Sequence, residues 1–234
     1  MNAVAPDPAT LDPTSIIDSD HPRIVAFARH KAGDIRDTVD KAVALYLAVR
    51  DGIWYDPYVP FHLPEHYRAS RVLSQERGYC VSKASLLCAL GRAAAIPTRL
   101  GFATVRNHLA TRELIEMMGT NTFVYHGYVE FHLEGRWVKA TPAFNRELCE
   151  RHGVEPLEFD GRGDSLFQAY NRENQRFMEY VVDHGTRPDV PVDEILAAWE
   201  AEYGRDRVRA WIHRNKGTDG ATARDFDREE IWKG

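Results

Sequence analysis

The sequence predicts an α+β fold in which one buried helix packs on an antiparallel sheet. Residues 80–95 are rich in Ala and Leu and include only two charged side chains. A helix that is apolar almost all round is typical of the centre of a protein. Residues 123–133 and 136–141 are extended segments on either side of Glu134-Gly135, which is a hairpin signal. A central helix and a separate antiparallel hairpin together indicate the α+β class.

The segment before the central helix contains one further predicted helix and an aromatic loop. Residues 1–20 carry three prolines, so we expect a flexible lead-in. Residues 36–50 place apolar side chains at helical spacing, and Asp34 or Asp37 is the candidate N-cap. Residues 52–63 hold four aromatic residues and two prolines. We expect a loop there, with a short extended piece.

The segment after the central helix alternates between strands and helices. Pro97 ends the helical pattern, and residues 98–105 are typical of a strand. The connection to the hairpin includes a short predicted helix at 112–118. Beyond the hairpin the signals weaken, and we expect helices at 168–182 and 192–212.

These elements divide the chain into regions. Gly204 is the residue most able to interrupt the last helix. The predicted regions are a lead-in at 1–20, a core at 21–145, a helical extension packed on the core at 146–215 and a polar tail at 216–234.

Composition argues against several classes of protein. Hydrophobic residues make up 44 % and charged residues 28 % of the chain, so it can bury a sizeable core. The formal net charge of −5 gives no general attraction to nucleic acid or to an anionic membrane. Acidic residues interrupt the one basic stretch, at 205–216, and we interpret it as a solvated helix face.

The sequence also predicts a cellular location. No apolar run approaches the roughly 18 residues of a membrane-spanning helix. The first residues lack the basic start and apolar block of a signal peptide. Three cysteines is an odd and low number for a secreted fold. We therefore expect a cytoplasmic protein without membrane or nucleic-acid partners, and the sequence gives no indication of an oligomeric state.

Cys80 is the candidate nucleophile because the central helix begins there. The first N–H groups of a helix have no partner within it, and with the helix dipole they favour a thiolate. A thiolate attacks carbonyl carbons, and the same N–H groups can stabilise the oxyanion that forms. A lone cysteine on an apolar helix is more often an inert core residue, which is how we interpret Cys88 and Cys149.

The predicted hairpin brings His126 within reach of position 141. With a two-residue turn, His132 faces Trp137 and Tyr128 faces Thr141. Because side chains alternate between faces, His126 and Thr141 become diagonal neighbours ~7–8 Å apart. A slip of one residue in the register would separate them.

Three segments in order resemble the transglutaminase-like superfamily, a group of papain-related cysteine enzymes. The run RGYC at 77–80, followed by the helix and AIPTRL at 95–100, resembles the nucleophile segment of that family. HGYVE at 126–130 and LEGRWV at 133–138 are similar to its strand pair. The resemblance covers roughly residues 36–145. It implies a papain/transglutaminase-like core.

The resemblance also implies a mechanism. Cys80 corresponds to the nucleophile and His126 to the general base, and an acyl-enzyme is resolved by water or by an amine. The third family residue is an aspartate in W-V-x-x-D-P, whereas this chain reads WVKATP at 137–142, with Thr141 in its place. A threonine hydroxyl can accept a hydrogen bond from the imidazole but supplies no charge. Other residues that could support His126 are Asn145, Asp160 and Asp164.

Four residues are candidates for binding the substrate. Such folds usually supply a second oxyanion donor from upstream of the nucleophile, and Gln75 and Tyr55 are the candidates. Tyr128 and Trp137 share the predicted face of His126, so they are candidates for lining a cleft, with packing as an equal alternative.

The sequence leaves three functions open. The first is an enzyme that hydrolyses or transfers the acyl group of a peptide or of a small amide or thioester. The second is a catalytically silent binding module on the same fold, which the threonine at position 141 favours. The third is an unrelated domain whose cysteine at position 80 lies in the core. We expect no metal or cofactor, because no CxxC or HExxH motif occurs.

Overall fold

The structure is an α+β fold built around a four-stranded antiparallel sheet. The computed structural model describes residues 6–215 and 226–232. The strands lie in the order β5-β4-β3-β6, and all neighbours are antiparallel. Their bounds are β3 Thr98–Asn107, β4 Thr122–Leu133, β5 Arg136–Ala140 and β6 Met178–Arg187. A separate pair of short parallel strands, β1 Trp54–Tyr55 and β2 Arg77–Gly78, lies just before the central helix.

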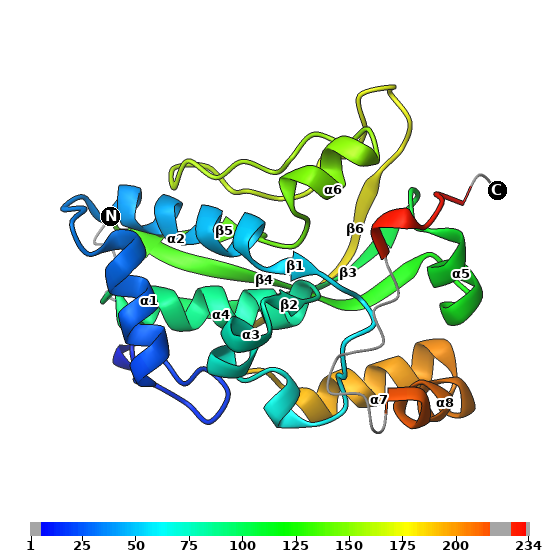
Figure 1. Ribbon diagram of the computed structural model, residues 1–234, viewed down its shortest axis with the longest axis horizontal. Coiled ribbons are helices and arrows are strands. Elements are labelled where there is room, and N and C mark those ends of the chain that lie inside the picture. The colour runs from blue at the N-terminus through cyan, green and yellow to red at the C-terminus, as the bar shows by residue number, and fades with distance from the viewer. Residues whose placement is uncertain (1–5, 216–225, 233–234) are drawn as a thin grey trace.

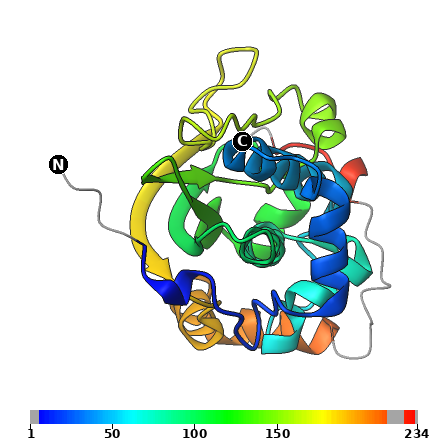
Figure 2. The same ribbon diagram turned by 90° about the vertical axis from the view of Figure 1, so that its left-hand side faces the viewer.

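The central helix is α4, Cys80–Ala93, and it is buried as predicted. Every residue from 81 to 92 is buried, including the two charged ones. The helix packs on β3 and β4 and is enclosed by three other helices. Figure 2 shows α4 end-on in the middle of the molecule, with the sheet curving around one side of it. The enclosing helices are α1 Pro22–Ala32, α2 Thr38–Gly52 and α3 Ala69–Gln75.

The hairpin has the predicted register. His132 pairs with Trp137, Glu130 pairs with Lys139, and the ladder ends where Val129 meets Ala140. Position 141 therefore lies just beyond the last paired residue. Near the other end of β4, Tyr125 has a φ of +58° and the pairing with β3 shifts. This irregularity comes immediately before His126 and allows the strand to bend there.

The C-terminal part differs from the expectation in one important respect. The segment expected to be helical at 168–182 instead ends in β6, which pairs with β3 at the edge of the sheet. Strand-favouring residue types occur at Tyr180, Val181 and Val182. Pairing with β3 gives the backbone of this segment its hydrogen-bond partners. The region 146–215 therefore completes the core sheet rather than only adding helices to it.

The remaining helices largely follow the sequence. The predicted helix at 112–118 is α5, Arg112–Met118. The predicted helix at 192–212 is divided by Gly204, which has a φ of +90°. The two parts are α7 Val192–Tyr203 and α8 Arg205–Asn215, and a short α6, Arg146–Arg151, follows the hairpin. The sequence analysis predicted neither α1 nor α3.

Both ends of the described chain pack on the core. From residue 6 onward the lead-in packs on the core, because Ile16 and Ile17 are buried and the Ile16 carbonyl accepts a hydrogen bond from the Ala69 N–H. One 3₁₀ turn lies in it, Pro8–Thr10, and another precedes α3, Pro64–His66. Of the predicted polar tail, 216–225 and 233–234 lie outside the described residues. The rest begins with the 3₁₀ turn Phe226–Arg228 and continues to a bridge between Ile231 and Thr111.

Two buried polar side chains bind the C-terminal end of α2. The Lys83 ammonium donates to the carbonyls of Arg50 (2.9 Å) and Ile53 (2.5 Å). The Asn145 amide donates to the same two carbonyls at 2.6 and 2.8 Å and accepts from the N–H of Tyr55 at 2.7 Å. Burial lowers the pKa of Lys83 well below its usual value. The network fixes the path of the chain from α2 into β1.

Replacing Asn145 tests this network. Asn145→Ala should lower the free energy of unfolding by about 1–3 kcal/mol, because it leaves the buried Tyr55 N–H without its acceptor. The measurement is urea unfolding of both proteins. Asn121→Ala is the control, since Asn121 is only partly buried and its side chain forms no hydrogen bond within the described residues. Equal losses in the two variants would contradict the proposed role.

Gly127 allows β4 to approach the first turn of α4. A Cβ atom built on Gly127 would lie 2.9 Å from the Cα of Val81, which is a backbone atom and cannot rotate away. The glycine therefore sets the closest distance between the strand of His126 and the helix of Cys80.

Gly127→Ala should push the strand away from the helix. We expect a loss of about 1–3 kcal/mol in the free energy of unfolding, together with slower alkylation of Cys80 by iodoacetamide. Gly52→Ala is the matched control, because a Cβ there meets nothing within 4 Å. A variant at position 127 that is as stable and as reactive as the control would show that the close approach is unimportant.

Candidate active site

Cys80 is the first residue of α4, and its sulfur faces backbone N–H groups. The chain enters the helix with the N–H of Tyr79 donating to the hydroxyl of Ser82 at 2.9 Å. The N–H groups of Gly127, Val81 and Cys80 itself lie at the sulfur and favour the thiolate. Burial acts in the opposite direction and is the larger effect, so the pKa of Cys80 is raised to about 11. The resting cysteine is therefore a neutral thiol, contrary to the expectation from the helix terminus alone.

His126 lies in an apolar part of β4. Its side chain is buried, and its ring packs 5.1 Å from that of Phe167 and 6.5 Å from that of Tyr180, between centroids. The Nε2 atom is buried without a hydrogen-bond partner. Burial lowers the pKa of His126 to about 3. The imidazole is therefore neutral near pH 7, and one of its nitrogens is available for a proton.

Cys80 and His126 lie together in the walls of two adjoining cavities. The larger cavity has a volume of about 260 Å³ and the smaller one of about 70 Å³. Both residues line both cavities, and so does Tyr55. A group that enters either cavity thus meets the thiol and the imidazole. The structure brings together the predicted nucleophile, the predicted base and one of the four predicted binding residues.

Thr141 is buried near the site, but no hydrogen bond joins it to His126. Its hydroxyl has no hydrogen-bond partner, just as Nε2 of His126 has none. The hydroxyl lies beside that of Tyr180 without hydrogen-bond geometry. Burial raises the pKa of Tyr180 to about 12, so this phenol is neutral as well. The supporting role of Thr141 stays a prediction.

The other candidates for supporting His126 are engaged elsewhere. Asp160 accepts hydrogen bonds from Arg162 and Gly163 within its own loop. Asp164 accepts from the N–H of Lys139. Asn145 belongs to the network around α2 described above. The structure therefore gives no carboxylate to His126 from these positions.

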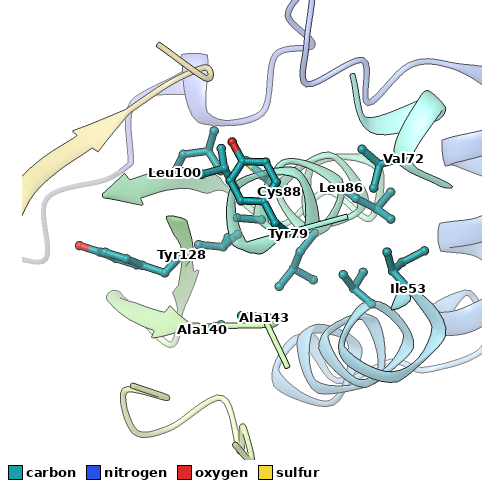
Figure 3. Close-up of a cluster of buried hydrophobic side chains, with 14 of the residues drawn as sticks. Ile53, Val72, Tyr79, Leu86, Cys88, Leu100, Tyr128, Ala140 and Ala143 are labelled. Atoms are coloured by element: carbon teal, nitrogen blue, oxygen red, sulfur yellow. The ribbon is translucent and has the colours of Figure 1, made fainter. Parts of the chain in front are cut away.

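Three of the predicted binding residues lie outside both cavities. The guanidinium carbon of Arg99 lies over the Trp137 ring, 4.1 Å from the centroid of that ring. Tyr128 packs against Gly101, and Figure 3 shows its ring directed away from α4. Gln75 lines a separate surface depression beside α3. The alternation rule places Tyr128 on the face of His126, but the Tyr128 ring packs on Gly101 and under Lys139 rather than in either cavity.

The sequence analysis missed the aromatic wall of the larger cavity. Trp199 and Tyr203 come from α7, and Trp211 comes from α8. Their spacing within an amphipathic pattern was the available signal, but periodicity alone shows only that a face is apolar. Figure 1 shows α7 and α8 side by side below the sheet.

The described residues show no metal centre and no membrane-spanning element. Within 6–215 and 226–232, no group of three His, Cys, Asp or Glu side chains is arranged to hold a metal ion. In the same part of the chain, no helix has both the length and the apolar character needed to cross a bilayer. All three cysteines are free thiols.

The buried imidazole predicts an acid-sensitive fold. Because the pKa of His126 is about 3 when folded and near 6.5 when unfolded, the unfolded chain takes up a proton first as the pH falls. This contribution to stability is complete above pH ~6.5 and is lost towards pH 3, by up to roughly 5 kcal/mol. The measurement is the free energy of urea unfolding of wild type and His126→Phe from about pH 4 to about pH 8. The variant should lose less stability at acid pH, and parallel curves would contradict the assignment.

Comparisons with known proteins place this geometry in a family. A profile of the transglutaminase-like superfamily matches residues 25–142, just over half of the chain. No curated protein sequence matches the chain.

Several solved structures share part of the fold at low identity. A candidate cysteine protease from Cytophaga hutchinsonii aligns with a TM-score of 0.48 and 18 % identity over 81 % of this chain. The periplasmic domain of TgpA from Pseudomonas aeruginosa aligns with a TM-score of 0.41 and 20 % identity over 59 % of this chain and 48 % of its own length. The chain spans about half the length of the Cytophaga protein. The profile match over residues 25–142 shows that the chain belongs to the transglutaminase-like superfamily.

Proposed function

We propose that the protein is a cysteine-dependent enzyme that hydrolyses or transfers the acyl group of a peptide or of a small amide or thioester. The observation that carries the proposal is the position of Cys80. Its sulfur lies at a helix N-terminus among three backbone N–H groups, and it shares the walls of two cavities with His126. A core cysteine without a function needs neither a cavity nor a histidine beside it.

The proposed first half-reaction forms an acyl-enzyme. The Cys80 sulfur bonds to the carbonyl carbon while His126 takes the thiol proton. The oxyanion is stabilised by N–H groups at the start of α4 and at Gly127. The tetrahedral intermediate then expels an amine or thiol, which receives the proton from the imidazolium. The products are an acylated Cys80, a neutral His126 and the protonated leaving group.

The second half-reaction restores the enzyme. Water or an amine attacks the acyl carbon while His126 takes its proton. The bond between carbon and sulfur breaks, and the imidazolium returns the proton to Cys80. The acid or amide product leaves, so His126 serves once as base and once as acid in each half.

The resting protonation states leave the proton on Cys80 and leave His126 neutral. The raised pKa of Cys80 and the lowered pKa of His126 mean that both groups are uncharged near pH 7. Proton transfer therefore accompanies attack on the substrate, rather than preceding it as in an ion pair. A hydroxyl that accepts a hydrogen bond from the imidazolium would assist this transfer, and Thr141 is the proposed residue for that role.

Acylation of Cys80 is the direct test of the proposal. Incubation with the acetyl thioester of N-acetylcysteamine should place one acetyl group on Cys80, detected by mass spectrometry of the peptide that contains it. His126→Ala should slow this acylation by roughly 10²–10⁴-fold, which is the usual contribution of a general base. Cys88 and Cys149 are internal controls in the same digest. Absence of acetylation at Cys80, or acetylation of Cys80 at the same rate in His126→Ala, would contradict the mechanism.

A catalytically silent binding module is the second candidate function. The observation in its favour is that Nε2 of His126 and the hydroxyl of Thr141 are both buried without partners among the described residues, so Thr141 does not orient the imidazole through this nitrogen. This function predicts that ligands occupy the cavities of the wild-type protein without forming an acyl-cysteine. A cytoplasmic location also stays a prediction.

A further inference from the structure

The larger cavity is lined by aromatic side chains from four parts of the chain. β1 and the loop after it contribute Tyr55, Tyr58 and Phe61, and Tyr79 precedes Cys80. β4 contributes Phe123 and Tyr125, and α7 and α8 contribute Trp199, Tyr203 and Trp211. The rings contact each other directly: the centroids of Phe61 and Trp199 are 4.7 Å apart, and those of Tyr203 and Trp211 are 5.5 Å apart. Such a wall offers edges and faces for a further ring.

The polar ends of two wall residues are already occupied. The indole N–H of Trp199 donates to the carbonyl of Val124 at 3.1 Å. The hydroxyl of Tyr203 donates to the carbonyl of Thr122 and accepts from the N–H of Val124. These bonds fix α7 to β4 and leave the rings, rather than the polar groups, for a ligand. Recognition in this cavity is therefore mainly apolar.

The charges around the cavity also argue against a cationic ligand. Arg214, at the end of α8, is the one charged side chain among the described residues that line it. It is exposed, and it forms no hydrogen bond or ion pair with another described residue. No carboxylate among those lining residues is present to bind a cation. A positively charged substrate group would be desolvated beside apolar rings and would also be repelled by Arg214.

The two cavities differ enough to separate the two parts of a substrate. A volume of about 260 Å³ holds several times the ~30 Å³ that one water molecule occupies. The smaller cavity has about 70 Å³. Since Cys80 lies in the walls of both, a carbonyl at its sulfur can direct one substituent into the larger space.

We propose that the larger cavity binds the acyl group of the substrate and selects an uncharged aromatic acyl group. This inference rests on the proposed function, because it assigns the acyl donor of the same cysteine. The wall residues Trp199, Tyr203 and Trp211, on α7 and α8, lie beyond the residues matched to the family, whereas the other wall residues lie within them. The part of the wall formed by α7 and α8 therefore lies outside the matched core.

A set of thioesters with one common leaving group tests the selection. The probes are the acetyl, phenylpropionyl and aminohexanoyl thioesters of N-acetylcysteamine, and the readout is kcat/KM for loss of the thioester. The phenylpropionyl compound should react at least about tenfold faster than the acetyl compound, within the range for apolar pockets. The cationic aminohexanoyl compound should gain nothing over acetyl. Equal rates for acetyl and phenylpropionyl would overturn the inference while leaving the proposed function intact.

A cavity-filling variant locates the selection. Met117 lies on α5, is partly exposed and lines only the larger cavity, so Met117→Trp should fill that space without removing core packing. We expect the ratio of kcat/KM for the phenylpropionyl compound to that for the acetyl compound, both measured with the variant, to fall to about onefold. Ile115→Trp is the matched control, because Ile115 is equally partly exposed on the same helix and lines neither cavity. A preference that survives in Met117→Trp would overturn the assignment to this cavity.

A binding measurement separates failure of the inference from failure of the proposed function. If no thioester acylates Cys80, the proposed function is wrong, and titration of Cys80→Ala with phenylpropionamide decides the inference alone. Saturable binding that is lost in the Cys80→Ala, Met117→Trp double variant and kept in the Cys80→Ala, Ile115→Trp variant would support an aromatic site. Absence of binding to Cys80→Ala would overturn it.

Discussion

The carbonyl groups at the C-terminal end of α2 are bound by two buried side chains, and the position of the central helix α4 depends on this contact. Lys83 lies one turn after Cys80 in α4, and Asn145 follows the hairpin, so the shared carbonyls of Arg50 and Ile53 join three segments that are distant in sequence. Asn145 also holds the N–H of Tyr55, whose ring lines both cavities. The same contact thus places the helix of Cys80, the β1 segment and the end of the hairpin relative to one another.

Burial has an electrostatic consequence for Cys80 and His126 as well. A protein interior favours the uncharged form of every ionisable group that lacks a charged partner. The pKa of Cys80 is raised and the pKa of His126 is lowered for this same reason, against the influence of the N–H groups at the sulfur. An enzyme with an aspartate at position 141 would place a charge near the imidazole. With Thr141 the site has no such charge, which is why a neutral resting pair follows from the structure.

The sequence predicts those parts of the fold that depend on neighbours in the chain. The turn at Glu134-Gly135 sets the register of β4 and β5 by counting, and the apolar composition of α4 sets its burial. Cys80 and His126 were found because each has a local signal. β6 was missed because it pairs with β3, nearly eighty positions earlier, and its exposed Val181 and Val182 give no alternating pattern. The aromatic cavity could not be predicted, since it forms only when α7 docks on β4.

Cys80 and His126 lie in the core, whereas part of the aromatic wall comes from the C-terminal helices α7 and α8. Cys80, His126 and the N–H groups at the sulfur come from one helix and one strand, whose separation is limited by Gly127. Changes in this part alter the distance between the thiol and the imidazole. The wall from α7 and α8 is held by other contacts, which are hydrogen bonds between α7 and Thr122, Val124 and Tyr125 on β4 and between α8 and α5. Because these contacts do not involve Gly127, the packing that limits the separation of Cys80 and His126 is distinct from the packing that forms this part of the wall.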